Sequence, residues 1–428
     1  MIYFDNNATT IMPTCVIEKI CAWMNKGNPS ADYKTAKECR ALMAQTRNFI
    51  AKNCSFLAYE PETNYSKEQL KKVYQVIFTS CASESNNFII RSVATAYKFH
   101  SKRVPHFILS SIEHKSILKC AQNMANTGNI ELSLVDPNQL GFIEPEQVEK
   151  AIKPNTCLIS IMSANNEIGT INNIKKIGQL AHKHRVPFHT DCAQTFGKYK
   201  IDPVDCCVDA FSVSIHKLHG PPGIGLLVIK KSFIDGYHLL PEICGSQNGD
   251  MRGGTENILG IAGAYEALKY TWECRQQKNT NLAKVKQFIM EQLANKINSQ
   301  TYREYLENPN KFESVTTNNT SIVFISSMIS TLPNTILLAI VKRKEPLLCN
   351  VKAKKELEKR GVIISIGSAC NTSNKKASHV LDALGADQFI KKGALRISLP
   401  DDVTMLAGET FVQKFMEVFD MAADGKLS

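Results

Sequence analysis

Three short stretches place reactive or ion-binding side chains where the sequence predicts the end of a strand. In the first, the apolar run 210–213 leads into Ser214, His216 and Lys217, and a Gly/Pro turn follows at 220–223. A lysine at a strand end can form a Schiff base with a carbonyl compound if its surroundings lower its pKa. An ordinary surface lysine fits the same pattern, so this stretch alone leaves both explanations open.

The second stretch carries an acid. Asp191 follows the apolar run 186–189, and a carboxylate at the end of a buried strand is costly unless it meets a cation. A protonated pyridine nitrogen would serve, and an aspartate in that role keeps pyridoxal phosphate acting as an electron sink. Aspartate also favours the N-cap of a helix, which explains this segment equally well on its own.

The third stretch is the turn 79–87, rich in serine and asparagine, between a predicted strand and a predicted helix. The first N–H groups of a helix lack partners and its dipole is positive there, so such a turn suits a phosphate group. A plain serine cap would have the same sequence. Taken together, the phosphate turn, the aspartate and the lysine indicate a pyridoxal phosphate enzyme of fold type I.

The apolar pattern predicts the scaffold for these groups. Helical stretches near 85–99, 115–127, 144–152 and 173–184 alternate with short β-branched runs at 76–79, 107–109, 157–161, 186–189, 210–213 and 225–229. Such alternation predicts βαβ units and a mostly parallel sheet covered by helices on both faces. Ligands of these sheets bind at the carboxyl ends of the strands, where the three stretches lie.

The chain changes character after about residue 256. It predicts long helices over 258–298, strands at 321–325 and 336–341, a helix at 350–359, a strand at 362–366 and a last helix at 404–423. This pattern predicts a second, smaller α+β domain. The polar stretch 59–72 predicts an exposed insertion, and 299–319 predicts a mobile loop.

Composition excludes several classes of protein. The chain has 428 residues, and its 51 Lys+Arg against 40 Asp+Glu give a net charge of +11. The basic residues are spread along the chain, which favours a solvated basic surface over a nucleic-acid partner. No apolar run approaches the roughly 18 residues of a membrane span. No secretory signal opens the sequence, so we expect a cytoplasmic protein whose 14 scattered cysteines form no disulfide framework and no metal site.

Collinear motifs from residue 3 to residue 399 carry a family resemblance. The sequence resembles the cysteine desulfurases of the NifS/IscS type in the class V aminotransferase family, on the segments 3–10, 27–30, 113–115, 165–169, 191–194, 214–217, 252–257, 367–370 and 395–399. The resemblance implies a large cofactor-binding domain over 13–257 with a mostly parallel, seven-stranded sheet. It also implies a small domain made of 1–12 and 258–428.

The resemblance implies a role for each matching residue around pyridoxal 5'-phosphate. Lys217 would hold the cofactor and act as a base on the substrate α-carbon, and Asp191 would pair with the pyridinium nitrogen. Gln194 would hydrogen-bond the ring phenolate oxygen. His114 would stack on the ring and serve in proton transfer. The phosphate would be held by Ala82, Ser83, Ser214 and His216.

The same resemblance implies how substrate and partners are bound. Asn166, also counted with the cofactor-binding residues, and Arg396 would grip the carboxylate of L-cysteine. Thr255 would reach the phosphate of the other subunit of a homodimer. Cys370 would attack the substrate sulfur and carry it as a persulfide to an acceptor protein, an iron–sulfur scaffold or a thiolation enzyme. Membrane and metal partners are not expected.

Departures from the family pattern and two rival functions complete the prediction. Cys81 stands where glycine is usual, 244–250 lacks the usual Glu-Arg pair, 220–223 reads Gly-Pro-Pro-Gly, and 327–361 is longer than usual.

One rival is a selenocysteine lyase or another enzyme of the same fold. The other is a non-catalytic basic binding protein on that fold, against which the retained Lys217, Asp191, His114, Cys370 and Arg396 argue.

Overall fold

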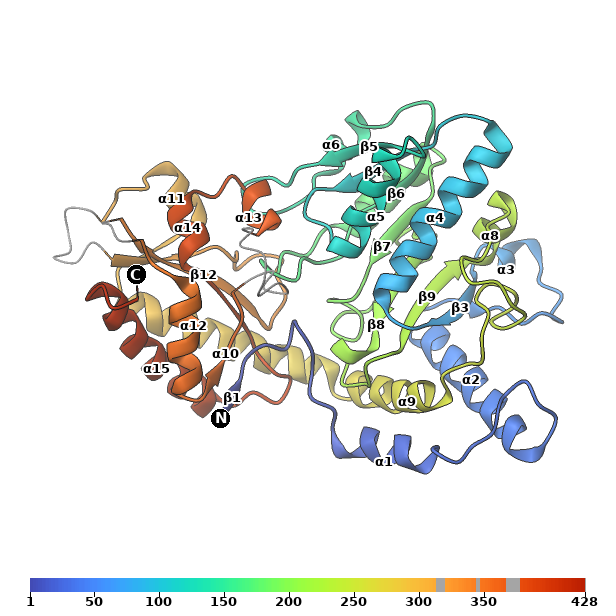
Figure 1. Ribbon diagram of the computed structural model, residues 1–428, viewed down its shortest axis with the longest axis horizontal. Helices are drawn as coiled ribbons and strands as arrows, with labels where there is room; N and C mark the ends of the chain where they lie inside the picture. The colour runs from blue at the N-terminus through green and yellow to red at the C-terminus, as the bar shows by residue number, and fades with distance from the viewer. Residues whose placement is uncertain (313–319, 344–346, 367–377, 428) are drawn as a thin grey trace.

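The computed structural model describes residues 1–312, 320–343, 347–366 and 378–427, which form two lobes (Figure 1). The elements up to residue 237 are α1 (Thr14–Ala22), α2 (Lys34–Asn53), β2 (Leu57–Ala58), α3 (Lys67–Leu70), β3 (Val73–Thr79), α4 (Ala82–Ser101), β4 (His106–Ser110), α5 (Lys115–Asn126), β5 (Glu131–Val135), α6 (Pro145–Lys150), β6 (Thr156–Ser160), α7 (Ile174–Lys183), β7 (Phe188–Asp191), β8 (Ala210–Ser214), a 3₁₀ turn η1 (Ile215–Lys217), β9 (Gly225–Lys230) and α8 (Lys231–Tyr237), preceded by β1 (Ile2–Tyr3). The later elements are α9 (Ile258–Trp272), α10 (Arg275–Lys296), β10 (Ser299–Thr301), α11 (Tyr302–Glu307), β11 (Thr320–Phe324), β12 (Thr335–Lys342), α12 (Asn350–Lys359), β13 (Val362–Ile363), α13 (His379–Ala383), α14 (Gln388–Gly393), β14 (Ala394–Ser398) and α15 (Met405–Ala423).

Each lobe is built on its own sheet. Within the described residues the larger sheet has eight strands in the order β2-β3-β9-β8-β7-β6-β4-β5, and only β9 runs antiparallel to its neighbours. The smaller sheet has the order β10-β11-β12-β14. The first strand, β1, pairs with β13, so the N-terminal segment lies against the C-terminal part of the chain. The domain boundaries 13–257 against 1–12 and 258–428 remain a prediction.

Helices cover both faces of the larger sheet. Along β4, Phe107 and Leu109 pack with α4, α5 and α8, while Ile108 packs on the opposite face with α2, α7 and α9. Strands β3, β4 and β8 are buried at every residue as a result. This burial explains why they read as continuous apolar runs in the sequence rather than as alternating ones.

The predicted α/β architecture is confirmed, with three differences. All six β-branched runs form strands of the sheet, but the two-residue strand β2 adds an eighth strand to the expected seven. The edge strand β5 was not predicted, because it is half exposed and its apolar signal is weak. The prediction of a loop over 299–319 is wrong for 299–307, which forms β10 and α11, and 313–319 lies outside the described residues.

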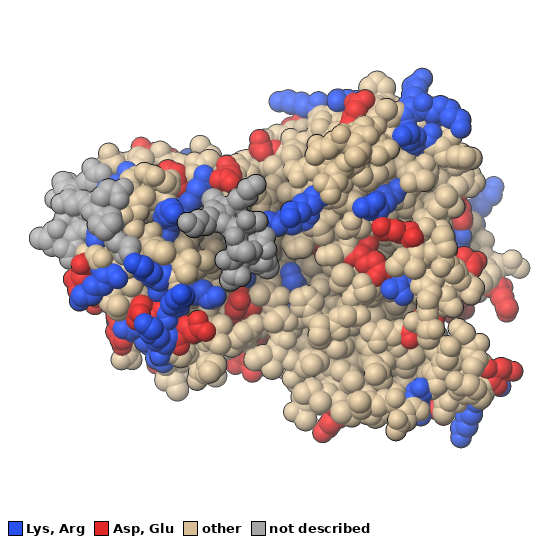
Figure 2. Space-filling view, viewed as in Figure 1, with Lys and Arg blue, Asp and Glu red and all other residues tan. Residues whose placement is uncertain are grey.

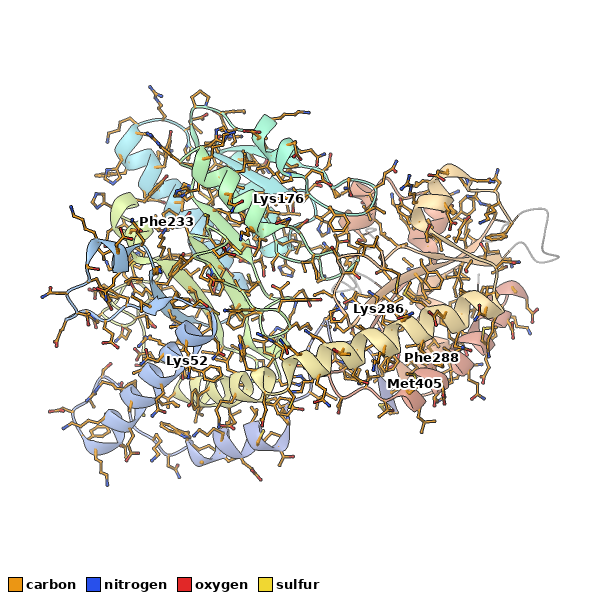
Figure 3. The ribbon with its side chains drawn as sticks, turned by 180° about the vertical axis from the view of Figure 1, so that it is seen from behind. Lys52, Lys176, Phe233, Lys286, Phe288 and Met405 are labelled. Carbon is orange, nitrogen blue, oxygen red and sulfur yellow. The ribbon has the colours of Figure 1, made fainter. Side chains whose placement is uncertain are left out.

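Helix α10 connects the two lobes. Figure 3 shows it running from the large lobe to the small one, with Lys286 along its length. The buried Lys286 amine donates hydrogen bonds to Thr331 Oγ1 at 2.8 Å and to the Leu332 carbonyl at 3.1 Å. Burial lowers the pKa of Lys286 to about 8. The helix is therefore tied by its side chains to the segment that precedes β12.

Truncating one core residue tests the packing of the N-terminal segment on the small lobe. Phe411 of α15 is fully buried, and its ring centre lies 5.5 Å from that of Phe4. Phe411→Ala should lower the free energy of unfolding by about 3–5 kcal/mol, the usual cost of a large cavity. Urea denaturation followed by circular dichroism measures it. Leu406→Ala on the same helix, where the side chain is 69% exposed, is the control and should change little.

Candidate active site

Lys217 lies at the carboxyl end of β8, in the 3₁₀ turn η1. The His216 carbonyl beside it accepts hydrogen bonds from the Thr10 backbone N–H at 3.0 Å and the Thr10 hydroxyl at 2.9 Å. Burial, and then the charge of Lys217, lower the pKa of His216 to about 4, so this imidazole is neutral. The lysine turn is thus held from one side by the N-terminal segment.

Asp191 is buried at the carboxyl end of β7, the neighbour of β8 in the sheet. Asn86 of α4 donates to its Oδ2 at 2.8 Å, and the Ala193 backbone N–H donates to its Oδ1 at 2.8 Å. A carboxylate has about four acceptor sites, so these two bonds leave room for a further donor. The carboxylate is therefore oriented by the protein and still able to accept a hydrogen bond from a ligand cation.

Two residues that the sequence did not single out connect Asp191 with His114. The Asn86 amide also donates to Ser116 Oγ at 3.0 Å, and Ser116 Oγ lies 2.8 Å from His114 Nδ1. The Ser116 backbone N–H donates to the same nitrogen at 3.2 Å, so His114 caps α5. These bonds fix the ring of His114, and because Nδ1 accepts the backbone N–H, Nε2 carries the proton of the neutral ring.

His114 shares one electrostatic environment with the other two predicted groups. Desolvation by the surrounding protein lowers the pKa of His114; the charge of Asp191 raises it, and the charge of Lys217 lowers it. The side chain is nevertheless accessible to solvent. His114, Asp191 and Lys217 thus lie near enough to one another for their charges to interact.

Glu113, next to His114, is a buried acid behind the site. Its Oε1 accepts hydrogen bonds from Ser110 Oγ at 2.5 Å and from the Met162 backbone N–H at 2.7 Å. Its Oε2 is buried without a partner among the described residues. Burial raises the pKa of Glu113 to about 8 in spite of these bonds, so the side chain is protonated at neutral pH.

The turn into α4 leaves its helix N-terminus open to an anion. Cys81 is the N-cap, and its side chain caps no backbone N–H of the helix, which starts at Ala82 and Ser83. The backbone at Cys81 is fully extended, with φ −172° and ψ 167°, a conformation that any residue adopts, so a cysteine is tolerated where glycine is usual. The close approach is instead at Gly225, where a Cβ would lie 2.5 Å from the Cys81 carbonyl carbon.

Arg396 lies in β14 of the small lobe with its guanidinium buried. Its Nη2 contacts Asp5 Oδ1 at 2.8 Å, and its Nη1 donates to the Asn166 carbonyl at 3.1 Å. Its Nε has no partner among the described residues. A guanidinium has five N–H donors, so the two bonds orient it and leave donors for a substrate carboxylate.

Asn7 joins these groups across the two lobes and was likewise missed as a functional residue. Its Nδ2 donates to the Asn166 carbonyl at 3.2 Å, and its own carbonyl accepts from Gln194 Nε2 at 3.1 Å. Asn334 of the small lobe donates to its Oδ1 at 3.0 Å. The motif around Asn7 supported the resemblance, but nothing in the sequence showed which segments the motif connects.

Two predicted residues do not join this cluster. Thr255 is exposed on the loop before α9, and no contact found in the described residues joins it to Lys217, Asp191 or His114. Cys370 lies outside the described residues. The loop 244–257, which lacks the usual Glu-Arg pair, is fixed to β3 by the buried Asn248, whose Oδ1 accepts from Arg47 Nη2 and from the Phe78 backbone N–H at 3.1 Å each.

The residues present fit pyridoxal phosphate. Gln194 Oε1 is buried near Asp191 in the chain without a hydrogen-bond partner among the described residues. An unpaired buried polar atom is costly, so this amide has hydrogen-bonding capacity left for a polar ligand. Asp191 can accept from a ring nitrogen, and the turn at Ala82 and Ser83 can take the phosphate. One N–H of Gln194 Nε2 donates to the Asn7 carbonyl, which leaves the second to donate to the ring oxygen.

Comparison with known proteins agrees with this geometry. The family described as "Aminotransferase class-V" matches residues 2–404. A cysteine desulfurase IscS from Dictyoglomus turgidum is 31% identical over 403 residues, covering 93% of this chain and 89% of the relative. The mitochondrial cysteine desulfurase of Saccharomyces cerevisiae is 28% identical over 93% of this chain and 71% of its own length.

Solved structures give the same result. A structure named as a NifS-like protein superposes with a TM-score of 0.80 at 28% identity, covering 98% of this chain and 99% of that one. A structure titled "SspA in complex with cysteine" gives a TM-score of 0.71 at 30% identity, covering 94% and 99%. The fold and the site thus define a pyridoxal phosphate-dependent enzyme of the class V aminotransferase family, to which this chain belongs. Within that family it is one of the cysteine desulfurases.

The protonated state of Glu113 can be tested through stability. The folded protein keeps a proton on Glu113 that the unfolded chain loses at lower pH, so the acid's contribution to stability falls as pH rises from about 4.5 to about 8. Glu113→Gln removes this titration. The stability of the variant relative to wild type should therefore improve over that range, by at most about 1.4 kcal/mol per pH unit.

Urea denaturation at pH 5, 6, 7 and 8 measures the effect. The exposed Glu62→Gln is the control and should give a difference from wild type that does not change with pH. A Glu113→Gln difference that is equally flat would show that Glu113 is already ionised in the folded protein.

Proposed function

We propose that this enzyme takes sulfur from L-cysteine, releases L-alanine, and receives the sulfur on Cys370. The observation that supports this most is the shared site, in which Asn86 and Ser116 link Asp191 to His114 and the charges of Asp191 and Lys217 both act on His114. Bound at that site, pyridoxal phosphate supplies an electron sink for the bonds at the substrate α-carbon.

Different residues of the chain hold the cofactor, transfer protons and bind the substrate carboxylate. Lys217 holds the cofactor and moves the proton at the α-carbon, and His114 is placed by Ser116 to exchange protons through Nε2. Arg396, oriented by Asp5 and by the Asn166 carbonyl, binds the substrate carboxylate. Oriented donors of this kind hold the substrate in one pose for reaction.

Sulfur transfer needs a thiolate nucleophile. The Cys370 thiolate attacks the sulfur of the substrate, a new S–S bond forms, and the C–S bond breaks with its electron pair leaving to the carbon side. A proton then completes alanine, so one cysteine and one thiol give one alanine and one persulfide. An acceptor protein takes the sulfur from Cys370, for iron–sulfur clusters or for thiolation.

The assembly completes the proposal. Thr255 is exposed, as the predicted contact with the phosphate of a second subunit requires, so we propose a homodimer with shared sites.

The described ranges contain no helix with the length and apolar character to cross a bilayer. A cytoplasmic location remains a prediction.

The charge distribution favours an enzyme over a basic binding protein. On the face drawn in Figure 2, Lys and Arg side chains lie over both lobes and are mixed with Asp and Glu. A nucleic-acid-binding protein typically concentrates its basic residues on one face or stripe. The net charge of +11 is consistent with an acceptor protein that presents an acidic surface.

Lys217→Ala tests the cofactor. The purified wild type should be yellow, and the variant should lose the visible absorbance of the lysine-bound cofactor, because no other residue is proposed to form that bond. Absorbance spectra with and without added pyridoxal phosphate measure this. The exposed Lys119→Ala on α5 is the control and should keep the wild-type spectrum. A colourless wild type that added cofactor does not change would contradict the proposal.

Cys370→Ala tests the sulfur step. The variant should keep the cofactor spectrum but lose sulfide release from cysteine in the presence of a reductant by about a hundred-fold or more, since the nucleophile is absent. Cys21→Ala, an exposed cysteine on α1, is the control and should release sulfide at the wild-type rate. Undiminished release by Cys370→Ala would remove Cys370 from its proposed role.

A further inference from the structure

A buried hydrogen-bonded pair joins the lysine turn to the small lobe. His219 lies two residues after Lys217, and Asp401 lies three residues after the end of β14, the strand of Arg396. His219 Nε2 is 3.1 Å from Asp401 Oδ2, and the two side chains are 10% and 16% exposed. The pair therefore connects the two segments that carry the proposed Schiff-base lysine and the proposed carboxylate-binding arginine.

Hydrogen-bond geometry assigns the proton on one ring nitrogen of this histidine. His219 Nδ1 lies 2.9 Å from the Ile11 carbonyl, which can only accept, so Nδ1 carries a proton. Burial acts to raise the pKa of Asp401, but the hydrogen bond from His219 and the charges of His219, Lys198 and Lys278 hold it below its usual value. Asp401 is then an ionised acceptor that lies within hydrogen-bond distance of Nε2.

A cation of the large lobe acts on the same carboxylate. Lys198 is buried, and its Nζ donates to the Gln194 carbonyl at 3.2 Å. Its charge lowers the pKa of Asp401, and the charge of Asp401 in turn opposes the lowering of the Lys198 pKa by burial. The charge of Asp401 thus also acts on a lysine that is hydrogen-bonded to the segment of Gln194.

The surroundings of His219 hold it in one conformation. Its backbone is left-handed, with φ 65°, a strained state for a residue with a side chain. The His219 backbone N–H donates to Thr10 Oγ1 at 2.7 Å, and the Tyr270 ring packs edge-on at 5.2 Å. The Lys278 ammonium lies 4.0 Å from the centre of the Tyr270 ring. Burial, and then the charges of Asp402 and Asp401, raise the pKa of Tyr270.

We propose that Asp401 is a positioning residue. Through His219 it holds the turn of Lys217 in place relative to the strand of Arg396. Through Lys198 it does the same for the segment of Gln194. Its carboxylate lies at the point where the two lobes and the N-terminal segment meet. Removing either partner would leave a buried polar group of the other without its hydrogen bond, so the pair acts as a unit. This proposal goes beyond the desulfurase activity, because it concerns how the two halves of the site are aligned.

A double-mutant cycle tests the proposal in the holoenzyme. Asp401→Asn removes the charge and keeps the shape, and His219→Asn keeps a residue that tolerates the left-handed backbone. The exposed pair His184 and Glu149, with Nε2 2.9 Å from Oε1, is the matched control as His184→Asn and Glu149→Gln. Four properties are measured for each variant: kcat and KM for cysteine, the thermal midpoint of unfolding, and the pH dependence of the cofactor's visible absorbance.

Coupling is the expected result. Each single variant of the His219–Asp401 pair should lower kcat/KM by at least about three-fold and shift the pH dependence of the absorbance, and the double variant should be no worse than either single one. The control pair should leave all four properties at wild-type values.

Two results would overturn the proposal. In one, the effects of His219→Asn and Asp401→Asn multiply in the double variant; in the other, both lower the thermal midpoint while the kinetic constants and the absorbance profile stay at wild-type values. The absorbance is recorded without cysteine, so this test is separate from the proposed function. An absorbance shift in a protein that releases no sulfide would refute the desulfurase proposal and leave the role of Asp401 standing.

Discussion

A buried carboxylate at the end of β7 is the constraint on which the site depends. Asp191 lies inside the sheet, where an ionised group without partners would be very costly. Asn86 and the Ala193 backbone supply two hydrogen bonds, and Asn86 extends the network through Ser116 to His114. Because Asn86 lies in the second turn of α4, the same bonds that satisfy Asp191 also place the helix whose N-terminus is suited to a phosphate.

The N-terminal segment connects polar groups of the two lobes through a small number of hydrogen bonds. Through Asn7 it contacts Gln194 and Asn166 on one side and Asn334 on the other, and Asp5 holds Arg396 from the same segment. Two of these four contacts are hydrogen bonds to backbone carbonyls and two join side chains. A short segment of ten residues can therefore align groups that lie hundreds of positions apart in the chain.

Prediction from sequence succeeded where periodicity and local chemistry carried the information. The strands buried on both faces formed unbroken apolar runs, and Lys217 and Asp191 followed two of them directly. It failed at the half-exposed edge strand β5 and over 299–307, because short peripheral elements have little apolar signal. Asn86, Ser116 and Asn7 were not predicted as functional, since a polar side chain acquires its role from partners that are distant in sequence.

The sequence by itself determined the class of fold, the family and the types of chemical group at the strand ends, because these depend on local pattern and on motifs that keep their order along the chain. Only the tertiary structure decided which groups share hydrogen bonds and charges: the path from Asp191 to His114, the holding of Arg396 by Asp5, and the pairing of His219 with Asp401. The physical reason is that these interactions act over a few ångströms between segments far apart in the chain, so their energies exist only after folding has brought the segments together.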